Sequence, residues 1–191
     1  MFKLFFKNVE EKVALSTAEK TAIGEKLERK EIKKGQFLLR ADEICNQIVF
    51  IEKGVLRTYL KDENGFDHVI FFGLEGWTAG DLNSFMKQQP ARFYIDALED
   101  CELTMICKTV HDELIETIPA FESYMRILMT NAYMASLTRT SDLISLSLEE
   151  RYKNFITSYP SIIQRVPQYM IASHLGVSPE TLSRLRAKII D

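Results

Sequence analysis

The stretch at residues 168–186 reads QYMIASHLGVSPETLSRLR and has the pattern of two short helices joined by a tight turn. Ile171 and Leu175 lie four residues apart on one face of the first helix, and Ala172 is small where a second helix must approach closely. Gly176 can take the left-handed conformation that ends a helix without a steric penalty. The pattern therefore predicts a helical hairpin of the helix-turn-helix type.

The second helix of this hairpin has a strong start signal and two different faces. Ser178 is a typical N-cap, and Pro179 suits the first helical position. Leu182 and Leu185 are expected to face inward. The outward residues are then Glu180, Thr181, Ser183, Arg184, Arg186 and Lys188.

Such a polar and basic face fits the major groove of DNA. An arginine there can donate two hydrogen bonds to guanine, and a glutamate can accept one from cytosine. Arg186, Lys188 and the amides at the helix N-terminus are better placed for phosphates. The alternative is a helical hairpin that binds nothing. We expect DNA contacts from Ser178, Pro179, Glu180, Thr181, Ser183, Arg184, Arg186 and Lys188.

Length and charge agree with a globular protein that meets a polyanion at one end. The chain has 191 residues, 46% of them apolar and 27% charged, which suffices for one domain or two small ones. Residues 151–191 hold six basic and two acidic side chains, whereas the rest of the chain holds 18 basic and 25 acidic. A basic segment on an acidic body favours a polyanionic partner that contacts this segment alone.

Residues 30–108 consist of short apolar runs separated by turn residues. The runs lie at 37–39, 48–51, 55–60, 69–72, 93–97 and 103–107. The sequence DENG at 62–65 is a hairpin signal, because Asn-Gly readily takes the positive φ that tight hairpins need. Strands at this spacing, with no helix-length pattern between them, predict a sandwich or barrel rather than a parallel sheet.

A long amphipathic helix is predicted at residues 118–144, with Pro119 in its first turn. Apolar residues recur at steps of three and four, as in the seam of a coiled coil. The seam residues are Ile118, then Phe121, Met125, Leu128, Ala132 and Ala135. We expect all but the first to contact a second copy of the chain. The alternative is a helix face that packs against the chain's own sheet.

Two further helices carry N-cap signals. One is predicted at 16–27, with Ser16 or Thr17 as the cap and Glu19 in the first turn. The other is predicted at 147–159, opened by Ser147 and stopped by Pro160.

Metal, redox and catalytic chemistry are not indicated. Cys45, Cys101 and Cys107 form no CxxC pair, and their odd number in a chain without a signal sequence indicates reduced thiols in a cytoplasm. A cupin-type enzyme needs a His/His/Glu metal cluster, whereas residues 30–108 contain one histidine, His68. No apolar run approaches the roughly 18 residues of a membrane span. We expect no enzyme, no metal and no evident cofactor.

The chain as a whole resembles the CRP/FNR superfamily of bacterial regulators over about residues 10–190. The matching segments are 48–60 with its Lys53-Gly54 turn, Gly80-Asp81-Leu82, 97–107, the 118–144 helix, Arg151 and 172–186. The resemblance implies an α+β fold, with an N-terminal antiparallel, jelly-roll-like β-roll of the cyclic-nucleotide-binding type, a long dimerisation helix and a C-terminal helix-turn-helix domain. The implied boundaries are 1–116, 117–145 and 146–191.

The same resemblance assigns roles at the DNA. Ser178, Glu180 and Arg184 occupy base-contacting positions, and Pro179 stands where the best-known activator has an arginine. Family members usually continue into a β-hairpin wing, whereas this sequence ends at Asp191. We therefore expect the wing to be truncated and the phosphate contacts to be fewer, with a shallower salt dependence.

The resemblance also points to an effector site. Cyclic-nucleotide binders hold the phosphate with a Gly-Glu-Leu loop and an arginine at a fixed distance before an alanine. Here the loop has aspartate, and the arginine position holds Ala91 with Arg92 adjacent. A one-residue offset in a strand turns a side chain to the other face. The candidate effector residues are Gly80, Asp81, Leu82, Arg92 and Ser136. The effector is unknown, and we do not expect cAMP.

The leading functional hypothesis is a homodimeric, cytoplasmic transcription regulator that reads a near-palindromic site in double-stranded DNA through a recognition helix at about 178–188. RNA polymerase is a further expected partner. The alternative is a ligand-sensing or protein-interaction module with weak or vestigial DNA binding.

Overall fold

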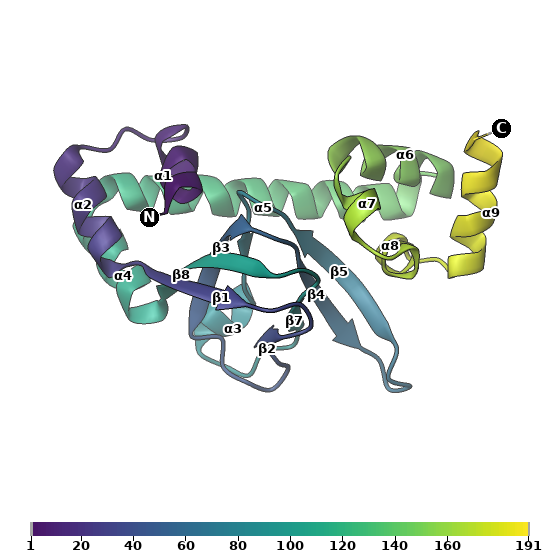
Figure 1. The fold of residues 1–191 in the computed structure, drawn as a ribbon, viewed down its shortest axis with the longest axis horizontal. Coiled ribbons are helices and arrows are strands. Elements are labelled where there is room, and N and C mark those ends of the chain that lie inside the picture. Colours follow the sequence, from purple (N-terminus) through teal and green to yellow (C-terminus); the bar gives the residue numbers. More distant parts are fainter. Residues whose placement is uncertain (1, 191) are drawn as a thin grey trace.

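The computed structural model describes residues 2–190 and contains two four-stranded antiparallel sheets that lie beside one long helix (Figure 1). The first sheet has the order β1-β8-β3-β6 and the second β2-β7-β4-β5. The strands of the first are β1 (Glu28–Ile32), β8 (Cys101–Cys107), β3 (Gln47–Lys53) and β6 (Thr78–Ala79). Those of the second are β2 (Phe37–Leu39), β7 (Tyr94–Ala97), β4 (Leu56–Lys61) and β5 (Asp67–Gly73). This architecture confirms the predicted β-roll and excludes a parallel sheet.

The long helix is α5 (Pro119–Ser145), and eight shorter helices are described beside it. Four precede it: α1 (Lys3–Glu10), α2 (Thr17–Lys26), α3 (Leu82–Lys87) and α4 (Lys108–Thr117). Four follow it: α6 (Leu148–Ser158), α7 (Ile162–Arg165), α8 (Gln168–Leu175) and α9 (Pro179–Ile190). Figure 1 shows α1, α2 and α4 at one end of α5 and the last four helices at the other end, with the sheets between. No helix among the described residues is long and apolar enough to cross a membrane.

Two apolar cores hold the molecule together. The larger lies between the sheets and under the first helices, and includes Phe5, Phe50 and Phe121. The second forms where the last four helices pack on the outer face of the second sheet, and joins Phe72 to Phe155. Because β4 alternates, Leu56 belongs to the first core and Tyr59 to the second. The first part of β4 is therefore buried on both faces.

Local capping signals are confirmed where the sequence predicts them. Ser16 caps α2 and forms a capping box with Glu19. Ser147 caps α6 and forms a second capping box with Glu150. The hairpin between β4 and β5 is also present, but only Gly65 of the Asn-Gly pair has a positive φ, of 82°. Asp62 organises this loop instead, because its carboxylate accepts hydrogen bonds from the N–H groups of Asn64 and Phe66.

Several elements are absent from the sequence-based prediction. The strand β1 consists largely of charged residues and has no strand-like apolar pattern. It forms because its backbone pairs with β8 from Glu28 to Ile32. The helix α3 covers six residues inside a region predicted to be all strand. Short elements of this kind are set by tertiary contacts more than by propensity.

Candidate nucleic-acid interface and sensor loop

The helix-turn-helix segment folds as predicted. α8 ends at Gly176, which has the left-handed φ of 73°. The N–H groups of Gly176 and Val177 bond back to the carbonyls of Ser173 and Ala172, so the end of α8 is satisfied internally. Ala172 has no exposed surface, as the close approach of α9 requires.

The start of α9 places charged and polar groups at its N-terminal end. The Ser178 hydroxyl accepts a hydrogen bond from the Thr181 N–H at 3.3 Å, as expected of an N-cap. The pKa of Glu180 is lowered, first by a hydrogen bond from its own backbone N–H and then by one from the Ser178 side chain. Glu180 is therefore an anionic acceptor at neutral pH.

The outer face of α9 is open to solvent, and Leu182 anchors the opposite face with 1% of its surface exposed. Exposed residues at this end of the molecule are Ser178, Pro179, Glu180, Ser183, Arg184 and Lys188. Thr181 and Arg186 are half-buried. The two-faced character expected of the recognition helix is thus present, and all eight candidate DNA-contacting residues lie on one segment.

A cluster of ion pairs fixes the last helices to the β-roll. Arg165 at the end of α7 donates to both carboxylate oxygens of Glu75, at 2.7 and 2.9 Å, and to both of Glu99, at 2.6 and 2.9 Å. Its side chain is 24% exposed. The guanidinium lowers the pKa of Glu75 to about 2, and the two carboxylates raise the pKa of Arg165. Two bidentate pairs on one guanidinium give a directional attachment.

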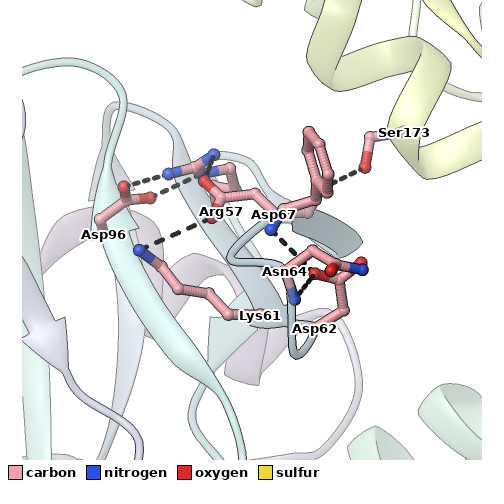
Figure 2. Close-up of polar contacts among 8 residues, drawn as sticks. Arg57, Lys61, Asp62, Asn64, Asp67, Asp96 and Ser173 are labelled. Atoms are coloured by element: carbon pink, nitrogen blue, oxygen red, sulfur yellow. Dashed lines mark hydrogen bonds and ion pairs between the residues drawn. The ribbon is translucent and has the colours of Figure 1, made fainter.

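The first helix of the hairpin also bonds to the edge of the second sheet. The Ser173 hydroxyl donates to the Asp67 carbonyl at 2.8 Å and accepts from the Val69 N–H at 3.0 Å, and Figure 2 shows it pointing from α8 to the β4–β5 hairpin. Arg139 of α5 donates to the carbonyls of Ile70 and His174 at 2.6 and 3.1 Å. The helix-turn-helix is therefore held against both the second sheet and the long helix.

A buried arginine organises the sheet beside this contact. Arg57 donates to both carboxylate oxygens of Asp96, at 2.6 and 2.9 Å, and to Asp67 at 3.0 Å (Figure 2). Its guanidinium also lies 3.9 Å from the centre of the Tyr59 ring. Burial raises the pKa of Tyr59 to about 12. This network fixes the hairpin whose backbone receives Ser173.

The predicted effector loop is satisfied by its own side chain. Asp81 is buried and caps α3, and its carboxylate accepts from the Ser84 N–H at 3.0 Å and from the Arg92 N–H at 2.9 Å. Arg92 is exposed and Ala91 is buried, so the arginine faces solvent rather than the interior. A Cβ on Gly80 would approach Ile48 Cγ2 at 3.1 Å. Leu82 and Ser136 are exposed, on α3 and α5.

The structure corrects the predicted dimer seam in its first half. Phe121 and Met125, 0% and 4% exposed, lie in the chain's own larger core, and Leu128 packs against that core. These three residues follow the alternative, a helix face that packs on its own sheet. Ala132 and Ala135 are exposed. The large apolar side chains exposed on α5 are instead Tyr133, Met134, Leu137, Leu143 and Ile144.

Sequence patterns missed the polar contacts that attach the helix-turn-helix. Arg165 and its acidic partners are 66 and 90 residues apart, and Ser173 is more than 100 residues from β5. No local periodicity connects such positions. Among residues 2–190 there is also no group of three His, Cys, Asp or Glu side chains that could hold a metal ion.

Comparisons with known proteins agree with this architecture. Residues 29–117 match the family model of the cyclic nucleotide-binding domain. The transcriptional regulatory protein btr of Bordetella pertussis is 25% identical over 173 residues, which cover 83% of this chain and 69% of the relative. The fumarate and nitrate reduction regulatory protein of Vibrio cholerae is 26% identical over 187 residues, covering 90% and 72%. The chain thus spans about two thirds of the length of these relatives.

The fold is likewise shared with solved structures. A protein of Eubacterium rectale assigned to the CRP/FNR family of transcriptional regulators superposes with a TM-score of 0.70 at 22% identity, covering 90% of this chain and 82% of that one. Residues 29–117 are therefore a domain of the cyclic nucleotide-binding type, and the chain is similar over most of its length to regulators of the CRP/FNR type. The relatives are regulatory proteins rather than enzymes.

Proposed function

We propose that this chain is a homodimeric, DNA-binding transcription regulator of the CRP/FNR type, with α9 as its recognition helix. The observation that carries the proposal is the exposed polar face of α9 on a helix-turn-helix whose other face is anchored by Leu182. DNA binding and dimerisation are typical of the family.

We assign base contacts and phosphate contacts to the residues of α9 from their charge and their position along the helix. Arg184 presents a guanidinium suited to guanine, and Glu180 an acceptor suited to the amino group of cytosine. Ser178, Thr181 and Ser183 add hydroxyl groups near the same helix end. Lys188 and Arg186 lie further along and are assigned to phosphates. Pro179 has no N–H and contributes shape alone.

The exposed apolar face of α5 supplies the second half of the proposal. Tyr133, Leu137 and Ile144 recur at steps of four and seven and are open to solvent. We assign the contact between two copies to this face, together with Ala132. Two recognition helices related by a two-fold axis would then meet major grooves about 34 Å apart and read a near-palindromic site.

We further propose that cAMP is not the effector. The Asp81 carboxylate already occupies the N–H groups of Ser84 and Arg92, and it would repel a phosphate placed beside them. The Arg92 side chain points to solvent. The boundaries at 116 and 145, the location in a cytoplasm and a contact with RNA polymerase complete the proposal as predictions.

Selection of bound fragments from random DNA at low salt, with and without cAMP, tests this function. We expect an enriched near-palindrome in both samples. Purified chain that is folded and dimeric but enriches no palindrome would contradict DNA reading and favour a ligand-sensing or interaction module. A palindrome that is enriched only when cAMP is present would contradict the effector proposal.

A further inference from the structure

A pocket of about 290 Å³ lies where three helices meet, away from the effector loop and from the outer face of α9. The long helix α5 contributes Arg139 and Asp142, α6 contributes Arg151 and Asn154, and α8 closes the pocket with His174. The pocket therefore contacts the long helix α5 and two of the helices that follow it, α6 and α8.

The two arginines of this pocket are half-buried, and they differ in their partners from Arg57 and Arg165, which are buried and half-buried. Arg57 and Arg165 each bind carboxylates, whereas the hydrogen bonds of Arg139 and Arg151 go to backbone carbonyls. Burial lowers the pKa of Arg139, as expected for a cation that is desolvated without an anion beside it. The pocket wall thus has cationic groups without a counter-ion.

The remaining charges do not cancel this excess. Asp142 is the one carboxylate that lines the pocket, against two guanidinium groups. His174 adds no charge, since burial lowers its pKa to about 3 and keeps the ring neutral at pH 7. The described lining therefore has a net formal charge of about +1 near neutral pH.

The same wall leaves polar atoms unsatisfied. Nε of Arg151 and Nδ1 of His174 are buried and have no hydrogen-bond partner among residues 2–190. Buried polar atoms are nearly always paired in folded proteins, so these two atoms are open to a polar partner from outside the described chain. Both atoms belong to residues of this one pocket.

An apolar surface faces the charged one. Phe155 and Leu175 line the pocket, and the Phe155 ring packs against His174 with 5.3 Å between ring centres. A pocket of this volume can hold a small organic molecule, from a few carbon atoms up to about one ring. A bare inorganic anion would leave the apolar surface uncovered.

We propose that this pocket binds a small organic carboxylate, with the carboxylate between Arg139 and Arg151 and the apolar body against Phe155. The ligand would connect α5, α6 and α8, and binding would stiffen the attachment of the helix-turn-helix to the long helix. The pocket is distinct from the loop at Gly80–Leu82, so this site does not depend on the DNA-binding proposal.

Calorimetric titration of the whole chain with benzoate, succinate and benzamide tests the site. Benzamide has the shape of benzoate without its charge. We expect one saturable site per chain for benzoate or succinate, with a dissociation constant of roughly 10 μM to 1 mM, and at least about tenfold weaker binding of benzamide. Failure of both carboxylates to saturate at about 10 mM, or equal binding of benzamide, would overturn the proposal.

Three variants, one of them a control, test where the ligand binds. Asn154→Asp adds a carboxylate at an exposed position of the pocket, so we expect benzoate to bind about fivefold or more weakly. Gln164→Glu adds the same charge on the exposed face of α7, outside the pocket, and is expected to leave binding unchanged. Arg139→Gln should abolish binding, with circular dichroism as the check on folding. Unchanged affinity in Asn154→Asp would place the carboxylate elsewhere and refute this site.

Discussion

Gly176 allows the turn between α8 and α9 because its backbone takes the left-handed conformation. Its φ is 73°, and a Cβ built there would meet no atom within 4 Å. The cost of a side chain is therefore backbone strain rather than a clash. Gly24 in α2 is the opposite case: its φ is not positive, and a Cβ would make an ordinary 3.5 Å contact with Phe6.

We expect Gly176→Ala to lower the free energy of unfolding by about 1–2 kcal/mol, the cost of a left-handed conformation for a residue with a Cβ. Gly24→Ala should instead raise it by about 0.5–1 kcal/mol, because alanine loses less entropy in a helix. Urea unfolding of both variants measures the two effects. Equal signs would show that backbone strain at Gly176 is not the cause.

The pairing of Arg165 with Glu75 predicts a pH-dependent stability. The folded-state pKa of Glu75 is about 2, below its ordinary value of 4.5, so this pair stabilises the folded protein above the ordinary pKa. The stabilisation is lost as pH falls towards the folded-state pKa. Arg165→Gln should lower the free energy of unfolding by about 1–2 kcal/mol at pH 7, a value reduced for the partial exposure of the carboxylate.

At about pH 3 the difference between wild type and Arg165→Gln should be roughly halved. Unfolding followed at both pH values provides the measurement. A difference that stays the same, or grows, at the lower pH would mean that Arg165 acts by packing and not through the charge of Glu75.

At the scale of one element, two basic residues of α9 are expected to contribute differently to DNA binding, one to base recognition and one to general electrostatic attraction. Arg184 lies in the middle of α9, and Lys188 lies about one turn further on; both are exposed. Arg184→Ala should cost about 1–3 kcal/mol at one base position and relax the preference there. Lys188→Ala should weaken binding to all sequences alike and reduce the salt dependence by about one unit of slope.

Binding of matched and single-mismatch duplexes at several salt concentrations distinguishes these two effects. Both residues are exposed, so neither substitution is expected to disturb the core. If Arg184→Ala weakened every duplex equally, its role as a base-reading residue would be wrong, although DNA binding itself would stand.

At the scale of the whole molecule, α5 changes its role along its length. Its first turns are covered by the chain's own core, and its later turns expose Leu137 at 52% and Ile144 at 83%. An exposed apolar face of this size marks an interaction site. The contact between copies is therefore expected closer to the helix-turn-helix than the sequence alone indicates.

Leu137→Glu should move the protein from dimer to monomer, because two acidic side chains would face each other across the two-fold axis. Phe66→Glu is the control: it places the same charge on an apolar residue that is also exposed, at 69%, on the β4–β5 hairpin. Sedimentation at several protein concentrations reports the mass. Dissociation by both substitutions, or by neither, would contradict a dimer contact on this face of α5.

The elements whose signals are local could be predicted from the amino-acid order alone. Ser16 and Ser147 cap their helices, and Gly176 and Ser178 define the helix-turn-helix, because capping and turn formation involve residues three or four positions apart. These features required no knowledge of the rest of the fold.

Which surfaces remain exposed depends on how the elements pack in three dimensions. A period of three and four residues identifies an apolar helix face without saying what covers it, and the sheets cover Phe121 and Met125 while leaving Leu137 open. The attachment of Arg165 to Glu75 likewise depends on segments that meet only when the last helices pack on the β-roll. The pocket at Arg139 and Arg151 follows from the same packing, because three helices must converge to form it.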